Sequence, residues 1–312
     1  MHVPDHLINN GTELVAAVSA AAVIGTVAAR SKSSATVDPD GSPASTLLAE
    51  PESMGAQLAT ASLVFALQMV NFPVLPGTSG HLLGGALATA LIGPRRALLA
   101  VSSVVIAQAL VFADGGVGAL GVNLWLIAIL PVAVAVAVRR FLTAGRSDSA
   151  APWWATAGVA AVLGPPLASL AFSLMYATGA TGEAAPGQVA ASMLAVHLAI
   201  GIGEAVLTLA ALYAVQRIPV WAVATVTAVG LSLAASSQPD GLERVAGDLG
   251  FAVTGPGSLL HSSPFADYSV GGLDGWMSPA AAGLVGLMMT CAVCAVMVGV
   301  TRRSAAPTAA RT

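Results

Sequence analysis

Apolar stretches of membrane-spanning length recur along the chain, separated by short polar or Gly/Pro-rich segments. A hydrocarbon layer about 30 Å thick needs roughly 20 apolar residues in a helix, because each residue advances the helix by about 1.5 Å. The pattern therefore predicts an all-α, polytopic helical bundle. Its transmembrane helices, about nine, lie near residues 11–30, 55–72, 79–94, 97–113, 117–138, 154–176, 189–214, 219–236 and 279–300. We expect the short third helix to begin as a partly buried, re-entrant segment.

The basic residues indicate how the bundle is oriented. Nine spans place the N-terminus outside and the C-terminus inside, and eleven of the twelve Lys and Arg residues then fall on the cytoplasmic side. Arg244 is the exception. The first apolar run is preceded by a segment without Lys or Arg and followed by Arg30 and Lys32. We therefore expect a retained helix in the cytoplasmic membrane rather than a cleaved signal peptide.

Composition supports this picture and narrows the function. Only 9% of residues are charged and 56% are hydrophobic, with a mean hydropathy of +0.83, which excludes a soluble protein. The net charge of −3 gives no reason to expect a nucleic-acid partner. Both cysteines lie in an apolar run, so a disulfide scaffold is not expected. The chain has neither a GxxxxGK[ST] loop nor an HExxH pattern, so we expect no ATPase or zinc hydrolase activity of its own.

The first two residues offer nitrogen ligands for a metal ion. A penultimate histidine is too bulky for the usual removal of the initiator methionine, so we expect Met1 to keep a free amine beside His2. The Met1 amine, the His2 amide nitrogen and His2 Nδ1 would close five- and six-membered chelate rings in one plane. Such a planar set suits Ni²⁺ or Cu²⁺, and one more imidazole would complete it. The alternative is a frayed terminus with an incidental histidine.

The segment NFPVLPGTSGHLLGG, residues 71–85, contains a candidate for the fourth nitrogen. Its prolines and glycines predict a turn-rich loop. The predicted threading places His81 on the same side of the membrane as His2, where the loop could bring it over the mouth of the bundle. The alternative is a loop histidine that caps the following helix.

Three sequence blocks carry a family resemblance. They are MHVPD at the start, MVNFPVLPGTSGHLLGGALATALIGP at 69–94 and QALVFADGGVGALGVN at 108–123. In this order and spacing, residues 1–215 resemble the substrate-binding membrane component of cobalt/nickel energy-coupling factor transporters, the CbiM/NikM type. PDGLE at 239–243, SPFADYSV at 263–270 and a last apolar span resemble the small accessory membrane protein (CbiN/NikN-like) of the same systems. This second part covers about 219–303, with an outside loop at 237–278, and a cytoplasmic tail follows at 304–312.

The resemblance implies a metal site made of Met1, His2 and His81. The family commonly has glycine where this chain has His6, whose imidazole could compete for metal, capture it or point to water. Asn71 and Asn123, at the outer ends of their helices, are expected to support the site by hydrogen bonds to an imidazole or to loop backbone, or to act as helix caps.

Other polar residues have two interpretations each. His197 and Glu204 lie seven apart on one predicted helix, hence on one face, and could form a proton relay or a polar pair facing the bundle interior. Asp114 is expected to be a turn residue that supports the site. The two PDGLE carboxylates are expected to be too few and too exposed to hold a transition metal alone, so the segment would cover or load the site. Met277 and His261 could add transient ligands.

The sequence thus predicts a membrane transport subunit rather than an enzyme, with Ni²⁺ or Co²⁺ as its cargo and no cofactor. The resemblance implies that a transmembrane coupling component and cytoplasmic ATP-binding cassette ATPases supply the energy. The alternative is a stand-alone, proton-coupled metal transporter that uses His197 and Glu204.

Overall fold

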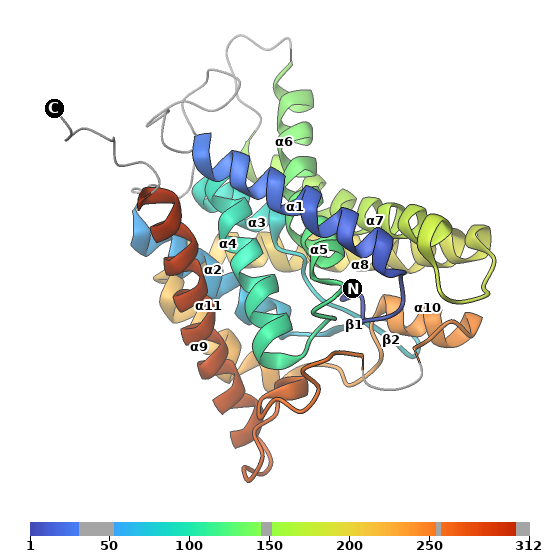
Figure 1. Ribbon diagram of the computed structural model, residues 1–312. Helices are drawn as coiled ribbons and strands as arrows, with labels where there is room; N and C mark the ends of the chain where they lie inside the picture. Colours follow the sequence, from blue (N-terminus) through green and yellow to red (C-terminus); the bar gives the residue numbers. More distant parts are fainter. Residues whose placement is uncertain (31–52, 145–151, 254–256, 304–312) are drawn as a thin grey trace, which may run out of the picture.

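The computed structural model describes residues 1–30, 53–144, 152–253 and 257–303, and these form a largely helical protein (Figure 1). The tail predicted at 304–312 and residues 254–256 of the predicted outside loop lie outside the described residues. The α-helices are α1 (Asn10–Arg30), α2 (Met54–Gln68), α3 (Gly85–Ile92), α4 (Pro94–Ala107), α5 (Leu120–Asn123), α6 (Leu130–Thr143), α7 (Trp153–Gly179), α8 (Pro186–Val215), α9 (Val220–Val229), α10 (Gly241–Leu249) and α11 (Met277–Arg303). The π-helical segment Gln108–Phe112 continues α4, and the π-helical segment Leu124–Ile129 joins α5 to α6. Two 3₁₀ turns occur in the described ranges, at Leu231–Ala234 and Ala266–Tyr268.

Six helices in the described ranges are long and apolar enough to cross a membrane. They are Asn10–Ala29, Pro94–Phe112, Leu120–Thr143, Trp154–Gly179, Pro186–Val215 and Met277–Val300. The shorter apolar helices α2 and α9 correspond to two further predicted spans. The third predicted span, 79–94, is wrong as a continuous helix, because only Gly85–Ile92 is helical. Eight residues rise about 12 Å, well short of a hydrocarbon layer of about 30 Å.

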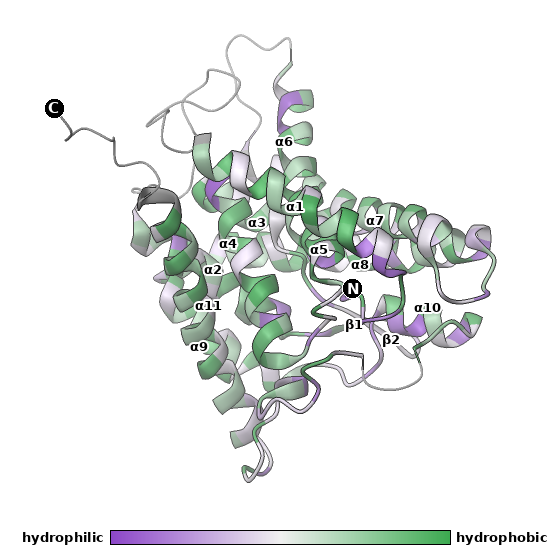
Figure 2. Cartoon of the chain, in the orientation of Figure 1, coloured by the Kyte–Doolittle hydropathy of each residue, from purple (hydrophilic) through white to green (hydrophobic). Residues whose placement is uncertain are grey.

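Large apolar side chains are exposed on the outer faces of the long helices, as expected of surfaces that meet lipid. In water an extended apolar surface of this kind would favour aggregation, whereas in a bilayer it contacts apolar lipid chains. The exposed residues include Leu14, Val18, Leu174, Ile202, Val206 and Val296. Figure 2 shows predominantly hydrophobic helices, with hydrophilic residues near the N-terminus and on α10.

The N-terminal and C-terminal parts of the chain share one hydrophobic core. Helix α11 packs against α2 and α4, α9 packs against α2, and α7 lies along α8. Phe65 of α2 and Leu287 of α11 belong to the same buried cluster. A methyl group at Gly286 would lie 1.8 Å from Phe65 Cζ, so the helices approach closely only because this residue has no side chain.

The loop after α2 departs from the predicted all-α fold. It forms a two-stranded antiparallel hairpin of β1 (Phe72–Leu75) and β2 (Thr78–Gly80), which turns at Gly77 with φ +73°. The next residues, 81–84, are buried without being helical. Such backbone is tolerated at membrane depth only when its polar groups have protein partners. Glu204 accepts from the N–H groups of Leu83 (3.0 Å) and Gly84 (3.1 Å), and Gln68 Nε2 donates to the Leu83 carbonyl (2.8 Å).

Candidate metal site

The N-terminal segment threads into the protein and is held by backbone hydrogen bonds. Met1 and Val3 are buried. Asn123 brackets Val3: its Oδ1 accepts from the Val3 N–H (2.7 Å), and its Nδ2 donates to the Val3 carbonyl (3.0 Å). The Gly116 N–H donates to the same carbonyl (2.9 Å). Asp5 accepts from Gly118 N (2.7 Å) and from Leu259 N (2.9 Å). The first residues are therefore ordered by loops from both parts of the chain.

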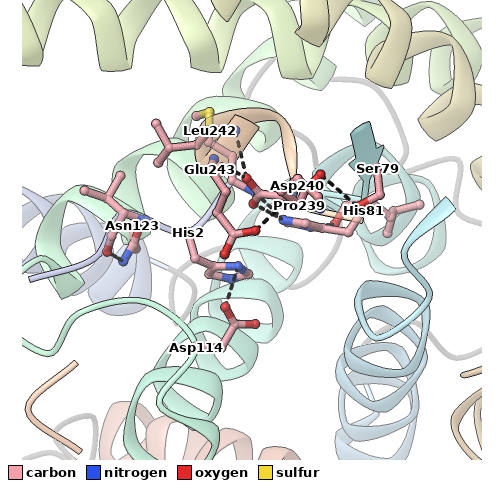
Figure 3. A network of polar contacts seen from close by, with 12 residues as sticks. His2, Ser79, His81, Asp114, Asn123, Pro239, Asp240, Leu242 and Glu243 are labelled. Atoms are coloured by element: carbon pink, nitrogen blue, oxygen red, sulfur yellow. Dashed lines mark hydrogen bonds and ion pairs between the residues drawn. The ribbon is translucent and has the colours of Figure 1, made fainter. Parts of the chain in front are cut away.

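Three nitrogen-bearing groups meet at this buried end, and Figure 3 shows two of them, His2 and His81, beside Asp240. The Met1 amino group contacts Nε2 of His81. The imidazoles of His2 and His81 are stacked, with ring centroids 5.0 Å apart and an interplanar angle of 18°. A carboxylate completes the cluster, because Asp240 Oδ2 lies 2.9 Å from the Met1 nitrogen and 3.8 Å from His81 Nε2.

Both ring nitrogens of His2 have partners. Nδ1 lies 3.0 Å from Asp114 Oδ1, and Nε2 lies 3.3 Å from Gln108 Oε1. The hydroxyl of Tyr268 donates to the other oxygen of Asp114 (2.5 Å). The predicted chelate uses His2 Nδ1, which here faces Asp114, so this ring must turn over before Nδ1 can join the Met1 amine. Gln108 begins a π-helical turn, a feature that is frequent at functional sites.

Burial sets the protonation of the cluster. It is the main reason that the pKa of His2 and that of His81 are lowered to about 3, and the positive N-terminal amino group adds to the effect. Both imidazoles are consequently neutral near pH 7 and keep the lone pairs that metal ligation requires. Burial alone would raise the pKa of Asp240, but the N-terminal amino group and His81 outweigh it and hold that pKa well below its usual range.

The PDGLE segment is built as a helix cap, and this corrects one expectation. Asp240 Oδ1 accepts from Leu242 N (2.7 Å) and Glu243 N (2.9 Å), while Glu243 Oε2 accepts from Asp240 N (3.0 Å). Glu243 is exposed as predicted, but the Asp240 side chain is only 13% exposed because it points at Met1. The Asp-x-x-Glu spacing is a capping-box signature, which could have located the start of α10 from sequence.

A cavity of about 590 Å³ lies over the cluster. Its lining includes His2, His81, Asp114, Asp240 and His261. His261 lies on its wall, with Nδ1 3.2 Å from the Ser258 carbonyl. The cavity connects the C-terminal loop region with the nitrogen cluster and offers a route by which an ion could arrive.

The other predicted site residues differ in how near they lie to the cluster. Asn71 lines the cavity, and its carbonyl accepts from Ser236 N (2.8 Å). His6 is exposed, and the described structure shows no contact between it and Met1, His2 or His81. Met277 is also exposed.

The cluster of Met1, His2 and His81 does not contain an ordinary side-chain metal motif. Among the described residues no three His, Cys, Asp or Glu side chains are grouped to hold a metal ion. A site here depends on the Met1 amino nitrogen in addition to side chains. Asp240 and Gln108 were not predicted as site residues, because their contacts with the N-terminus span more than 100 residues of sequence.

Two families account for nearly all of the chain. Residues 2–221, more than half of it, match CbiM, the cobalt uptake substrate-specific transmembrane region. Residues 216–303 match the PDGLE domain.

Curated relatives match in part. A putative fused nickel transport protein NikMN of Archaeoglobus fulgidus is 47% identical over 91 residues, which are 29% of this chain and 31% of that protein. A putative metal transport protein of Haloquadratum walsbyi is 35% identical over 147 residues, 46% of this chain and 64% of that protein. The fused nickel transport protein NikMN of Rhodobacter capsulatus is 34% identical over 110 residues, 35% of this chain and 32% of that protein. The aligned parts thus span about a third to two thirds of these relatives.

A solved structure shares the fold. The crystal structure of a truncated transition metal transporter superposes with a TM-score of 0.56 at 22% identity, covering 70% of this chain and 99% of that chain. Together with the spans and the family matches, this makes the chain a multi-pass membrane protein that belongs to the CbiM family of cobalt/nickel transport components, fused to a PDGLE domain.

Proposed function

We propose that the protein captures Ni²⁺ or Co²⁺ outside the cell and is the substrate-binding subunit of an ATP-driven energy-coupling factor transporter in the cytoplasmic membrane. The observation that supports this most directly is the buried meeting of the Met1 amino group with the neutral imidazoles of His2 and His81. With the His2 amide nitrogen these groups would supply four nitrogens. Such a set favours Ni²⁺ or Cu²⁺ by geometry and accepts Co²⁺.

The proposed topology keeps nine passes of the chain through the membrane, with the N-terminus outside and the C-terminus inside; the third pass combines the buried non-helical residues 81–84 with α3 and is not a continuous spanning helix. It rests on the distribution of basic residues and puts the cavity and the PDGLE segment on the outer side. Energy would come from a transmembrane coupling component and ATPase subunits, because the chain has no nucleotide-binding loop. The ion would be released when the N-terminal segment separates from His81, because the loss of one nitrogen ligand leaves the planar four-nitrogen set incomplete.

The test is a metal titration of the purified protein. Wild type is compared with His2→Ala, with His81→Ala and with a variant whose Met1 amine is blocked by an N-terminal extension. We expect each change to abolish tight one-to-one binding of Ni²⁺ and Co²⁺, because each removes at least one nitrogen from the set. His197 borders the cluster, in a small cavity that Met1, His81 and Asp240 also line, but it is not one of the proposed ligands, so His197→Ala should retain tight binding.

The same titration can contradict the proposed ligand set. Tight binding that survives blocking of the Met1 amine would show that the ligand assignment is incorrect.

The alternative function is a proton-coupled transporter that works without ATPases. One observation favours it: His197 is buried in α8 and its Nε2 has no hydrogen-bond partner in the described structure. However, His197 Nδ1 is 2.7 Å from the Met193 carbonyl, whereas Glu204 accepts from Leu83 and Gly84, so the two side chains serve different backbone groups. This function requires uptake to persist without ATPase partners and to stop in His197→Ala, while outside metal binding is retained.

A further inference from the structure

The carboxylate of Asp240 belongs to the PDGLE domain yet touches two of the nitrogen ligands proposed for the CbiM part. We propose that Asp240 Oδ2 is an additional, axial ligand of the transported ion and that it strengthens binding of Co²⁺ more than binding of Ni²⁺. This inference rests on the proposed function, because it needs the nitrogen set to be the metal site.

The carboxylate is held ready for this role. Its Oδ1 is fixed by the N–H groups of Leu242 and Glu243 at the start of α10, which leaves Oδ2 directed at the Met1 nitrogen. The turn itself is tied to the hairpin: Ser79 N donates to the Pro239 carbonyl (2.9 Å), and Ser79 Oγ donates to the Gln238 carbonyl (2.7 Å). Ser79 lies two residues before His81, so the carboxylate and the imidazole are positioned by the same strand. A ligand whose position is fixed by its own hydrogen bonds loses little entropy on binding metal.

The geometry of a four-nitrogen plane makes the fifth ligand axial. The four positions in the plane are filled by nitrogens: the Met1 amine, the His2 amide, a His2 ring nitrogen and His81. The Asp240 oxygen can therefore approach the ion only from above or below that plane. Ni²⁺ in a planar field of strong nitrogen donors is stable with four ligands and gains little from a fifth. Co²⁺ readily takes five or six ligands, and a carboxylate oxygen therefore adds to its binding.

A different role for Asp240 predicts the opposite result. If the carboxylate only neutralises the Met1 ammonium, it competes with the metal for that amine. Removing it would then tighten the binding of both ions.

The experiment measures the affinities of the full-length protein for Ni²⁺ and Co²⁺ by competition with a chelator, together with the visible absorption spectrum of the Co²⁺ complex. The variants are Asp240→Asn and Asp240→Ser, since Asn and Ser are both good N-caps and preserve the start of α10. Asp267→Asn is the control: Asp267 lines the same cavity with the same charge, and Asn tolerates its left-handed φ of 54°. High salt in all titrations screens the general field of the acidic residues.

We expect Asp240→Ser to weaken Co²⁺ binding by about tenfold or more, the scale on which groups that support metal sites act, with little change for Ni²⁺. The Co²⁺ spectrum should shift as the coordination number falls, and Asp267→Asn should match wild type. Asp240→Asn retains the oxygen that caps α10, and we expect it to change the affinities in the same direction. It therefore tests the axial-ligand role if Asp240→Ser does not fold.

Three results would overturn the axial-ligand role. They are equal affinities in wild type and both Asp240 variants, tighter binding of both ions by the Asp240 variants, and an equal loss of Co²⁺ affinity in Asp267→Asn. These outcomes differ from failure of the proposed function, in which wild type itself does not bind either ion tightly.

Discussion

At the scale of single residues, the N-terminal nitrogens proposed as ligands are positioned by residues outside the proposed ligand set. The loop Asp114–Gly118 lies so close to the N-terminal segment that Gly116 has no room for a side chain. A methyl group at Gly116 would lie 2.1 Å from Asp5 Oδ1 and 2.4 Å from the Asp5 nitrogen. Such distances are not possible between non-bonded atoms, so Asp5 and the chain that leads back to Met1 would have to move.

Gly116→Ala should therefore weaken metal binding without removing a ligand. Overpacking of this kind costs about 1–3 kcal/mol, which corresponds to roughly a tenfold or greater loss of affinity if it displaces the Met1 amine. The measurement is a Ni²⁺ titration. Gly247→Ala is the matched control, because a methyl group there meets no atom within 4 Å. Wild-type affinity in Gly116→Ala would contradict the tight approach of this loop.

At the scale of elements, one helix supports the segment that carries His81. Glu204, in the middle of α8, accepts from two successive N–H groups just beyond His81, and Gln68 of α2 satisfies a carbonyl there. These contacts let a non-helical segment run through the protein interior between the hairpin and α3. Movement of α8 would therefore be transmitted to His81 through Glu204.

Glu204→Gln should lower metal affinity although the residue is not a ligand. The glutamine amide can accept from only one of the two N–H groups and places its NH₂ against the other, and a buried N–H left without an acceptor costs about 1–3 kcal/mol. We expect weaker binding of both ions, measured by titration. The control is Thr208→Val, one turn further along α8, because the buried Thr208 hydroxyl has no partner in the described structure. Equal effects of the two substitutions would rule out a specific link from Glu204 to His81.

At the scale of the whole molecule, the two family regions form one body. Helices α9 and α11 complete the core around α2, and the PDGLE turn reaches the N-terminus. Burial of His2 and His81 between these regions lowers the pKa of each from 6.5 to about 3. The unfolded chain exposes both imidazoles and binds more protons than the folded protein between these values.

The metal-free protein should consequently lose stability as the pH falls from 6.5 toward 3 and be insensitive to these two groups above pH 6.5. Each buried imidazole contributes at most about 1.4 kcal/mol per pH unit, and a domain of this size loses about 2–4 °C in Tm per kcal/mol. Thermal unfolding in detergent at several pH values measures the slope. It should be shallower in His2→Ala than in wild type and unchanged in His261→Ala, a surface histidine. A Tm that rises on acidification in this range would refute the burial of neutral imidazoles.

Much of the architecture could be predicted from the sequence because it depends on local properties. Apolar runs of sufficient length located six long helices and two shorter ones in the described residues, since a helix in lipid must satisfy its own backbone. The blocks that include His2 and His81 indicated the family, which the CbiM and PDGLE matches confirm.

Tertiary structure alone decided the features that depend on distant partners. The apolar character of 79–94 could not distinguish a spanning helix from a hairpin followed by a buried non-helical segment, because that outcome requires Glu204 and Gln68 as partners. Nor could the sequence show that Asp240 is buried against Met1, since they are 239 positions apart. Hydropathy and chelate spacing are properties of neighbouring residues, whereas the pairing of a carboxylate, an amine and an imidazole is determined only when the whole chain packs together.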